Sequence, residues 1–309
     1  MRNNMISWWL HLTNRAIQSL DLLEGEPGIL AAWSRRDRVE FYELATGTPL
    51  GEKIIIFSDV YDRESEAWPK FLADLKAPNG AYLPVVQSAQ ATLHATDDGR
   101  MHLYHLDALY LENDGKEVKL EVPGEVTFPA MALDRFLALI AALDQNLHLH
   151  VYQQHIRVGT FDIGLTPVKE LRPMVAISRG GGSIFLTDGQ QVILTDSSGE
   201  VRRRANMHYF IRRMACSPDG SYLITCDMDA GVIRIYNGET LELAYQRYAV
   251  DLVAEARQIQ LLADLPPQFV APTALAINDE GVIAFAMAGV ICVTSLAHMN
   301  ELPRTRALL

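Results

Sequence analysis

The sequence predicts an all-β fold, a closed β-propeller of six blades formed by a single domain over residues 1–309. Residues 217–238 carry the pattern strand, tight turn, strand, turn, strand, and weaker copies of this pattern recur along the chain. A short strand near the start of the chain belongs to none of the copies. A unit repeated every few dozen residues buries its apolar faces only by stacking on its neighbours, which is how a propeller is built.

The third strand of each unit is recognised by an apolar-x-apolar core. Six copies occur, at residues 39–41, 101–103, 147–149, 192–194, 233–235 and 291–293. Most spacings between copies are close to the roughly 40 to 45 residues of a four-stranded blade, and the two longest predict insertions. Six copies predict six blades, and a seventh blade hidden in an insertion is the alternative.

A strand rich in apolar, small and β-branched residues precedes each copy, as expected for strands that are buried on both faces. These second strands are expected at residues 29–33, 91–96, 136–142, 183–187, 222–226 and 282–287. Turn residues that accept a positive φ lead into three of them, at residues 180–182, 218–220 and 279–281. The strand pattern and the turn pattern therefore predict the same hairpins.

The strand near the start of the chain is expected at residues 6–12, ahead of a first unit that begins near Arg15. A strand without a blade of its own can complete the last blade. Such pairing closes the ring and removes an exposed sheet edge, which otherwise invites aggregation.

The two long spacings are expected to hold helical insertions, at about residues 58–84 and 250–270. In the first, Trp68-Pro69 precedes Phe71, Leu72 and Leu75, which have the spacing of a short amphipathic helix. In the second, helical spacing starts at Leu252 and stops before two prolines, and an extended β-hairpin is the alternative. Each insertion either docks a partner or covers a blade edge.

The composition is that of a globular chain, because 49% of the residues are hydrophobic and only 21% are charged. The net charge of -11 gives no overall field that attracts polyanions. Other protein subunits are therefore the expected partners, and nucleic acid is expected only through a larger complex. Three cysteines are too few for a disulfide framework, no signal-peptide pattern opens the chain, and no apolar run reaches the roughly 18 residues that span a bilayer. We therefore expect a cytoplasmic protein that does not contact a membrane.

Residues 214–237 resemble a blade of the WD-repeat family. Ser-Pro-Asp-Gly at residues 217–220 matches that family's inner hairpin, Asp229 lies in its turn region, and residues 232–236 match its third strand. Tyr236-Asn237 replaces the Trp-Asp pair, and no Gly-His dipeptide precedes any blade, so the family's hydrogen-bonded tetrad is not carried over. The resemblance implies a divergent, bacterial-type WD-repeat-like propeller. It also implies a scaffolding role in protein complexes, in some cases beside an AAA-type ATPase.

Acidic residues recur in the predicted turns between second and third strands. These turns are residues 34–37, 97–100, 144–146, 188–190 and 227–229. Converging carboxylates and amides can hold Ca²⁺, so a metal-dependent lactonase or hydrolase of the six-bladed propeller type is the enzymatic alternative. Tight hairpins need the same residue types for their own backbones, and this structural explanation is favoured.

Histidine and glycine patterns do not predict a catalytic centre. His148 and His150 share a strand face, as two metal ligands would, but no third ligand follows at a telling spacing. The chain lacks Cys-x-x-Cys and Gly-x-Ser-x-Gly motifs, and residues 180–182 lead into a strand instead of a phosphate-binding helix. The sequence therefore predicts no catalytic residue, no metal site and no cofactor.

A basic cluster at residues 202–204 and 212–213 stands out from the acidic chain, and Tyr209 and Phe210 lie beside it. Arginine beside aromatic residues is typical of protein interfaces, although the same run on an outer strand can simply protect a blade edge. The predicted partner-binding surface combines this cluster with the turns between second and third strands and with the first inserted helix. Its residues are Arg35, Arg36, Trp68, Phe71, Arg100, Arg202, Arg203, Arg204, Tyr209, Phe210, Arg212 and Arg213. The predicted function is that of a non-catalytic scaffold or regulatory subunit in a cytosolic multiprotein complex.

Overall fold

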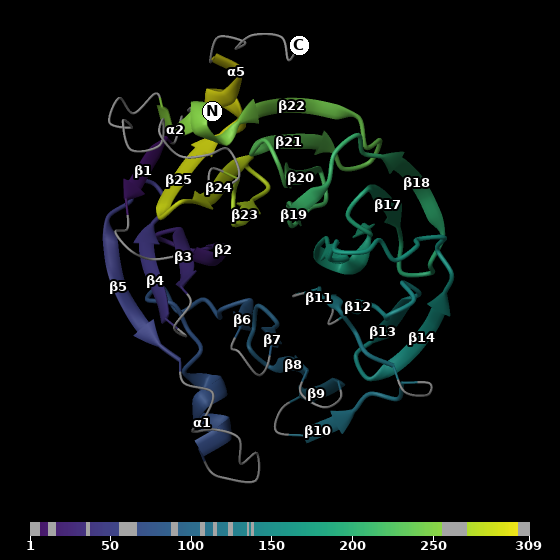
Figure 1. Cartoon of the computed structure of the whole chain (residues 1–309). Helices are drawn as coiled ribbons and strands as arrows, with labels where there is room; N and C mark the ends of the chain where they lie inside the picture. Colours follow the sequence, from purple (N-terminus) through teal and green to yellow (C-terminus); the bar gives the residue numbers. More distant parts are fainter. Residues whose placement is uncertain are drawn as a thin grey trace.

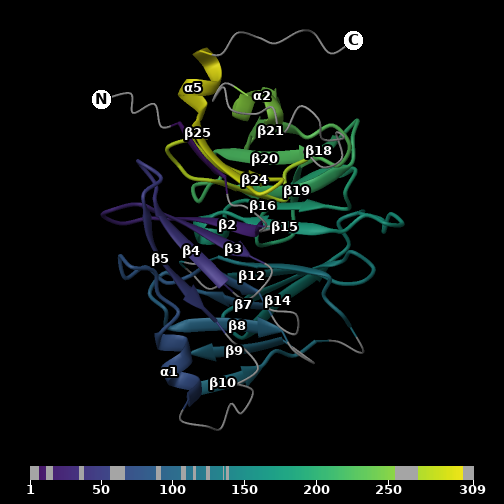
Figure 2. The ribbon, with the colours of Figure 1, turned by 60° about the vertical axis from the view of Figure 1, so that its left-hand side comes forward.

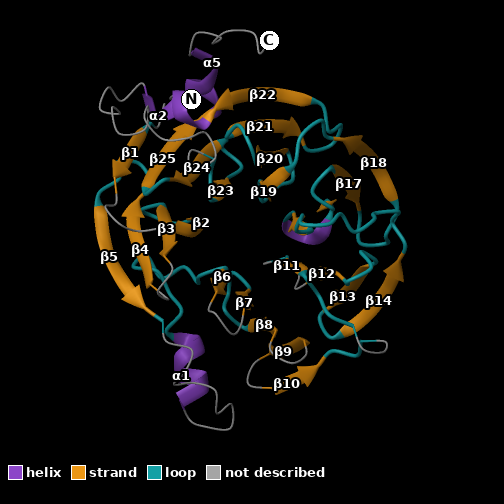
Figure 3. Cartoon of the chain, in the orientation of Figure 1, coloured by secondary structure: helices purple, strands orange, loops and turns teal. Residues whose placement is uncertain are grey.

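The computed structural model of the chain is a six-bladed β-propeller, as the sequence predicts (Figure 1). It describes residues 7–11, 17–34, 38–55, 67–87, 92–105, 109–113, 116–122, 126–134, 136, 139–254 and 271–301. In these residues six antiparallel sheets surround a central channel, and helices are few (Figure 3). None of the helices in these ranges is long and apolar enough to cross a membrane.

The blades follow one another in chain order around the ring, with the first strand of each innermost (Figure 1). Blade 1 contains β2 (Ile17–Leu23), β3 (Ile29–Ser34), β4 (Arg38–Glu43) and β5 (Pro49–Ile54). Blade 2 contains β6 (Val85–Gln87), β7 (Thr92–Ala95), β8 (Met101–His105), β9 (Leu109–Asn113) and β10 (Lys116–Lys119). Blade 3 contains β11 (Ala130–Leu133), β12 (Leu139–Leu143), β13 (Leu149–Gln153) and β14 (Ile156–Phe161).

The remaining blades complete the ring. Blade 4 contains β15 (Met174–Ile177), β16 (Ile184–Thr187), β17 (Gln191–Thr195) and β18 (Val201–Asn206). Blade 5 contains β19 (Ile211–Cys216), β20 (Tyr222–Asp227), β21 (Val232–Asn237) and β22 (Leu243–Tyr248). Blade 6 contains β23 (Ala274–Ile277), β24 (Val282–Met287), β25 (Val290–Ser295) and, as its outer strand, β1 (Trp8–His11).

The core consists of apolar layers between neighbouring blades, and β3 shows how the sequence builds them. Ile29, Ala31 and Trp33 pack toward blade 2, whereas Leu30 and Ala32 pack toward blade 6. Because successive side chains of a strand point to opposite faces, a strand between two layers must be apolar at every position. This explains why the second strands can be recognised in the sequence as continuous apolar runs.

Strand β1 closes the ring by pairing antiparallel with β25, which confirms the predicted role of the N-terminal strand. Trp8 extends the closure to blade 1, because its Nε1 donates a hydrogen bond to the Leu44 carbonyl at 2.8 Å. The Trp8 ring also covers the Gly47 turn and lies 6.5 Å from the Tyr42 ring, measured between centroids. The first strand segment of the chain therefore joins the last blade to the first.

Blade 2 has one more strand than the repeat predicts. Asp97, in the turn between β7 and β8, pairs at 3.6 Å with Arg179, which lies in the turn between the first two strands of blade 4. The β7–β8 turn therefore lies on the face that holds the first turns of the other blades. Strand β7, predicted as the second strand of this blade, therefore corresponds to the first strand of the other blades. Strand β6 is an additional strand that pairs with β7 on the channel side.

Blade 3 differs from the prediction in register. The third strand begins at Leu149 instead of Leu147, because Leu147 has a φ of 65° and lies in the preceding turn. The second strand begins at Leu139, and Phe136 is 67% exposed in the turn before it. The apolar spacing located both strands but not their ends.

Helix α1 (Ala67–Ala73) lies in the first predicted insertion, and its Leu72 is buried in the layer between blades 1 and 2. Helix α2 (Ala249–Ala254) starts the second insertion, whose residues 255–270 lie outside the described part of the chain. Helix α5 (Leu296–Glu301), which the sequence did not predict, follows β25. Figures 1 and 2 show α1 on one side of the ring and α2 and α5 on the opposite side.

The central channel encloses a cavity of about 580 Å³ with mostly apolar walls. At one mouth Arg179 reaches across the ring from blade 4 and pairs with Glu24 of blade 1 at 3.1 Å. His94, in the channel wall, is buried, and its Nε2 has no hydrogen-bond partner among the residues that the structure describes. Burial lowers the pKa of His94 to about 4, because the charged imidazolium would lose its hydration there.

Trp8→Ala is expected to lower the free energy of unfolding by about 3 kcal/mol, since it removes both the packing on Gly47 and the hydrogen bond to Leu44. Trp8→Phe keeps an aromatic ring and should lose much less. Urea unfolding followed by tryptophan-independent circular dichroism measures both. Equal stability of the Trp8→Ala variant and the wild type would show that β1 does not close the ring.

His94→Leu is expected to change how stability depends on pH. The unfolded chain binds a proton at His94 below a pKa of 6.5, whereas the folded chain does so only near 4, so wild-type stability falls as the pH drops between these values. The variant lacks this loss. Urea unfolding at pH 7 and pH 4 should show the difference between the two proteins shifting by about 3 kcal/mol toward the variant. A difference that is the same at both pH values would show that His94 is not buried.

Candidate functional site

Three of the turns between second and third strands use an aspartate to hold their own backbone. Asp144, Asp188 and Asp227 are buried at the ends of their second strands. The Oδ1 of Asp188 accepts from the N–H groups of Gln190 and Gln191 at 2.8 and 2.9 Å. The Oδ1 atoms of Asp144 and Asp227 each accept two backbone N–H groups in the same way. These contacts support the structural explanation of the acidic turns.

The second oxygen of each aspartate is also engaged. Oδ2 of Asp144 contacts His148 and His150, and Oδ2 of Asp227 pairs with Arg234 at 3.0 Å. Burial raises the pKa of the Asp144 carboxyl, but the hydrogen bonds from His150 and from the neighbouring backbone outweigh it, so the pKa lies below its usual value. In the described ranges no three His, Cys, Asp or Glu side chains gather as metal ligands would. The histidine pair thus binds a carboxylate of its own blade.

Blade 5 holds a hydrogen-bonded network. Its residues are not those of the WD-repeat tetrad, which is not carried over to this chain. The Tyr209 hydroxyl lies 2.7 Å from Thr225 Oγ1 and 2.7 Å from the Tyr236 hydroxyl. The Arg234 guanidinium covers the Tyr209 ring at 3.9 Å, which adds a cation–π contact. Burial, followed by the nearby Tyr236, raises the pKa of Tyr209 above its ordinary value. Different residue types therefore tie the loop before the blade to its second and third strands.

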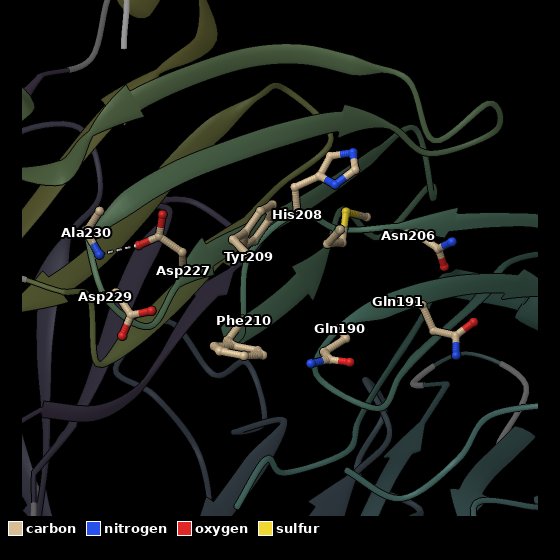
Figure 4. Close-up of a pocket in the computed structure, with 10 residues that line it drawn as sticks. Gln190, Gln191, Asn206, His208, Tyr209, Phe210, Asp227, Asp229 and Ala230 are labelled. Carbon is tan, nitrogen blue, oxygen red and sulfur yellow. Dashed lines mark hydrogen bonds between the residues drawn. The ribbon is translucent and has the colours of Figure 1, made fainter. Parts of the chain in front are cut away.

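A shallow pocket of about 540 Å³ lies between blades 4 and 5, at the face that carries the turns described above (Figure 4). We call it the rim pocket. It is lined by Gln190, Gln191, Asn206, Met207, His208, Tyr209, Phe210, Asp227, Asp229 and Ala230. Figure 4 shows Phe210 between the Asp229 side and the Gln190 side of the pocket.

The rim pocket presents apolar and amide groups together. Phe210 is 42% exposed and Met228 is 41% exposed, and the Met228 N–H donates to the Phe210 carbonyl, so the two are held side by side. Gln190 is exposed beside them. Large apolar side chains next to amides are a mixture typical of surfaces that bind peptide segments.

The arginines of β18 belong mainly to the blade itself. Arg204 donates to the carbonyls of Ile163 and Gly164, in the connection from blade 3 to blade 4. Arg202 pairs with Asp196 at 3.0 Å and donates to the Gly182 carbonyl. Within the described ranges Arg203 donates only to the carbonyl of Arg202, its neighbour. Two of the three predicted contact arginines are thus occupied by structural hydrogen bonds.

Arg212 and Arg213 lie at the start of β19, directly after Phe210 and Ile211. The pairing of β19 with β20 shifts register between Ile211 and Arg213, so Arg212 is an extra residue in a β-bulge. Arg213 Nε donates to the Thr273 carbonyl at 2.7 Å, just before blade 6. Both arginines therefore lie on the channel side of the rim pocket.

The other predicted contact residues lie elsewhere. Arg100 is exposed near Asp98 in the β7–β8 turn, on the opposite face. Phe71 in α1 is half-buried against the layer between blades 1 and 2, and Trp68 lies in the same helix. Arg35 and Arg36 lie outside the described residues. Of the predicted surface residues that the structure describes, Tyr209, Phe210, Arg212 and Arg213 lie together at the rim pocket, and Arg204 adjoins it through a hydrogen bond to Gln191 Oε1 at 3.0 Å.

Sequence reasoning missed the amide residues of the rim pocket and Met228. Gln190 and Gln191 come from blade 4, whereas Asp229 and Ala230 come from blade 5. One signal was available, because residues 206–210 combine polar and aromatic side chains just before a blade. The turns of blades 4 and 5 both contribute residues to the pocket, and no pattern along the sequence indicates that these turns lie side by side.

The fold is similar to two solved propellers. The chain matches the Cps50 (Swd1) β-propeller domain of Myceliophteria thermophila with a TM-score of 0.58 and 11% identity, over 92% of this chain and 99% of that one. It matches Raptor of Chaetomium thermophilum with a TM-score of 0.52 and 9% identity, over 92% of this chain but only 24% of that one. No protein-family model and no curated protein matches the sequence. The chain thus has the fold of a WD-repeat-like β-propeller.

Tyr209→Phe is expected to lower the free energy of unfolding by about 1 to 2 kcal/mol, since the hydroxyls of Thr225 and Tyr236 lose their shared partner. Tyr222→Phe, in the same blade, removes a hydroxyl that makes no hydrogen bond to the described residues and serves as the control. Urea unfolding compares the two. The same small effect from both changes would show that the network contributes nothing to stability.

Proposed function

We propose that this protein is a non-catalytic interaction platform that binds a segment of a partner protein at the rim pocket. The observation that carries the proposal is the exposed pair Phe210 and Met228 beside the exposed amide of Gln190. A rigid blade pair holds these groups, so they need not be ordered on binding, which favours affinity.

The acidic turns support the same proposal over the lactonase alternative. A metal site would need converging carboxylates that are free to bind a cation. Both oxygens of Asp144 and of Asp227 instead accept hydrogen bonds or ion pairs from their own blades. The donor set of these turns therefore fits a structural role.

The partner that we propose is a subunit of a cytoplasmic multiprotein complex, and the WD-repeat resemblance suggests an AAA-type ATPase system as one such complex. Helix α1 is proposed as a second contact, through Trp68. Phe71 is less suited to test it, since its half-buried ring also packs on the core.

Phe210→Ala is expected to weaken capture of the partner about tenfold or more, because a buried aromatic side chain contributes roughly 2 kcal/mol at an interface. Phe136→Ala is the matched control, as Phe136 is 67% exposed in the turn between β11 and β12, on the opposite face. Affinity purification of the tagged full chain from its source cells, with mass spectrometry of copurifying proteins, measures both.

Retention of the partner by Phe210→Ala, together with its loss in Phe136→Ala, would move the contact to the other face. Elemental analysis of the same preparation tests the alternative function. One tightly bound divalent ion per chain with no stoichiometric protein partner would overturn the proposal.

A further inference from the structure

Two chain segments that carry three arginines meet beside the rim pocket, where blades 4 and 5 meet the channel. Gly189 is the centre of this region, because its carbonyl accepts the Ile211 N–H at 2.8 Å. Leu171 packs so closely on Gly189 that an added Cβ would lie 2.8 Å from Leu171 Cβ. The next residues along these two segments are Arg172 and Arg212, and Arg213 follows. We call Arg172, Arg212 and Arg213 the arginine triad.

The β-bulge at Arg212 explains how one strand supplies two members of the triad. In a regular strand Arg212 and Arg213 would point to opposite faces. Ile211 pairs with Asp227 and Arg213 with Cys226, so Arg212 is an additional residue in the pairing. A bulge of this kind re-aims a side chain, and bulges are frequent beside functional sites.

The positive charge of the triad is not neutralised by a carboxylate of the described residues, although two N–H groups of Arg213 donate to the carbonyls of Thr273 and Arg212. In the described part of the chain no carboxylate forms an ion pair with Arg172, Arg212 or Arg213, whereas Arg202 and Arg234 each pair with an aspartate. Burial lowers the pKa of Arg213, and the charges of Arg212 and Arg172 lower it further. Like charges held together repel one another, and a bound anion would relieve that repulsion.

We infer that the arginine triad binds the phosphate of a phosphorylated residue in the partner segment whose neighbouring side chains occupy the rim pocket; this inference rests on the proposed function. Guanidinium groups match phosphate oxygens with paired N–H donors, and clusters of arginine are a recurrent means of recognising phosphorylated segments. Phe210 connects the two sites, since it lines the rim pocket and lies two residues before Arg212.

Charge around the triad favours a single phosphate over a nucleic acid. Asp229 is exposed on the rim pocket and would repel a second phosphate of a polyanion that lay along the face. The net charge of the chain, -11, opposes a long polyanion as well. A peptide with one phosphorylated residue can place its anion at the triad and its apolar and polar groups in the pocket.

The experiment measures binding of the full-length chain to a peptide library with a fixed central phosphoserine and random flanks, by fluorescence anisotropy. The unphosphorylated library, inorganic phosphate and a single-stranded oligonucleotide are the comparison probes. The phosphorylated library should bind at least tenfold more tightly than its unphosphorylated counterpart, and inorganic phosphate should compete. Equal binding of both libraries, or tighter binding of the oligonucleotide, would overturn the inference.

Arg212→Ala and Arg172→Ala should each reduce binding of the phosphorylated library at least fivefold. Arg172 is exposed, so its replacement remains informative if a change at the bulge affects folding. Arg203→Ala, which removes an equal charge from β18, is the control and should change binding less than twofold. Equal losses in all three variants would indicate a general charge effect and contradict the site.

Phosphatase treatment separates this inference from the proposed function. If the partner is still captured from a phosphatase-treated lysate and capture still requires Phe210, the interaction platform stands and the phosphate site is wrong. If capture does not depend on Phe210, the proposed function fails whatever the phosphopeptide probes show.

Discussion

The structure depends on the pairing of β1 with β25, since it makes a strand from the start of the chain the outer strand of the last blade and so ties the ends of the ring together. Trp8 extends the pairing to blade 1 through the Leu44 carbonyl and the Gly47 turn. Thr273 adds a hydrogen bond from the start of blade 6 to the Ile17 carbonyl of blade 1. Once the ring is closed, each blade has a neighbour on both faces and can bury its apolar second strand. The positions of the turns, and hence of the rim pocket, follow from this closure.

Closure gives the ring two faces with different chemistry. On one face, first turns bring Glu24, Asp97 and Arg179 together at the channel mouth. On the other, buried aspartates hold the turns so that exposed amides, Phe210 and the arginine triad are presented at fixed positions. The carboxylates considered as metal ligands are thus the groups that hold the turns of this second face in place. A rigid, mixed apolar and basic surface is suited to recognising a segment of another protein.

Much of the fold was predictable because its signals are local. The apolar second strands and the turn at residues 217–220 can each be recognised from a few consecutive residues, and the structure confirms the six blades that they predict. The additional strand β6 could not be predicted from the sequence. The ion pair that shows which strand of blade 2 is its first strand joins Asp97 to Arg179, and these two residues are far apart in sequence. The same limit applies to the site: Arg204 looked like a contact residue, but its guanidinium bonds to carbonyls of the preceding blade connection. Arg172 joins the triad only through contacts around Gly189.

Hydrogen–deuterium exchange of the chain, alone and in complex with its copurified partner, tests most directly the claim that this face binds the partner. We expect protection on complex formation at residues 188–191, 206–213 and 227–230, which surround the rim pocket and include two members of the arginine triad. Exchange in the first turns, at residues 178–182, 217–221 and 278–281, is expected to stay unchanged. Protection confined to those first turns, with none around Phe210, would contradict that claim.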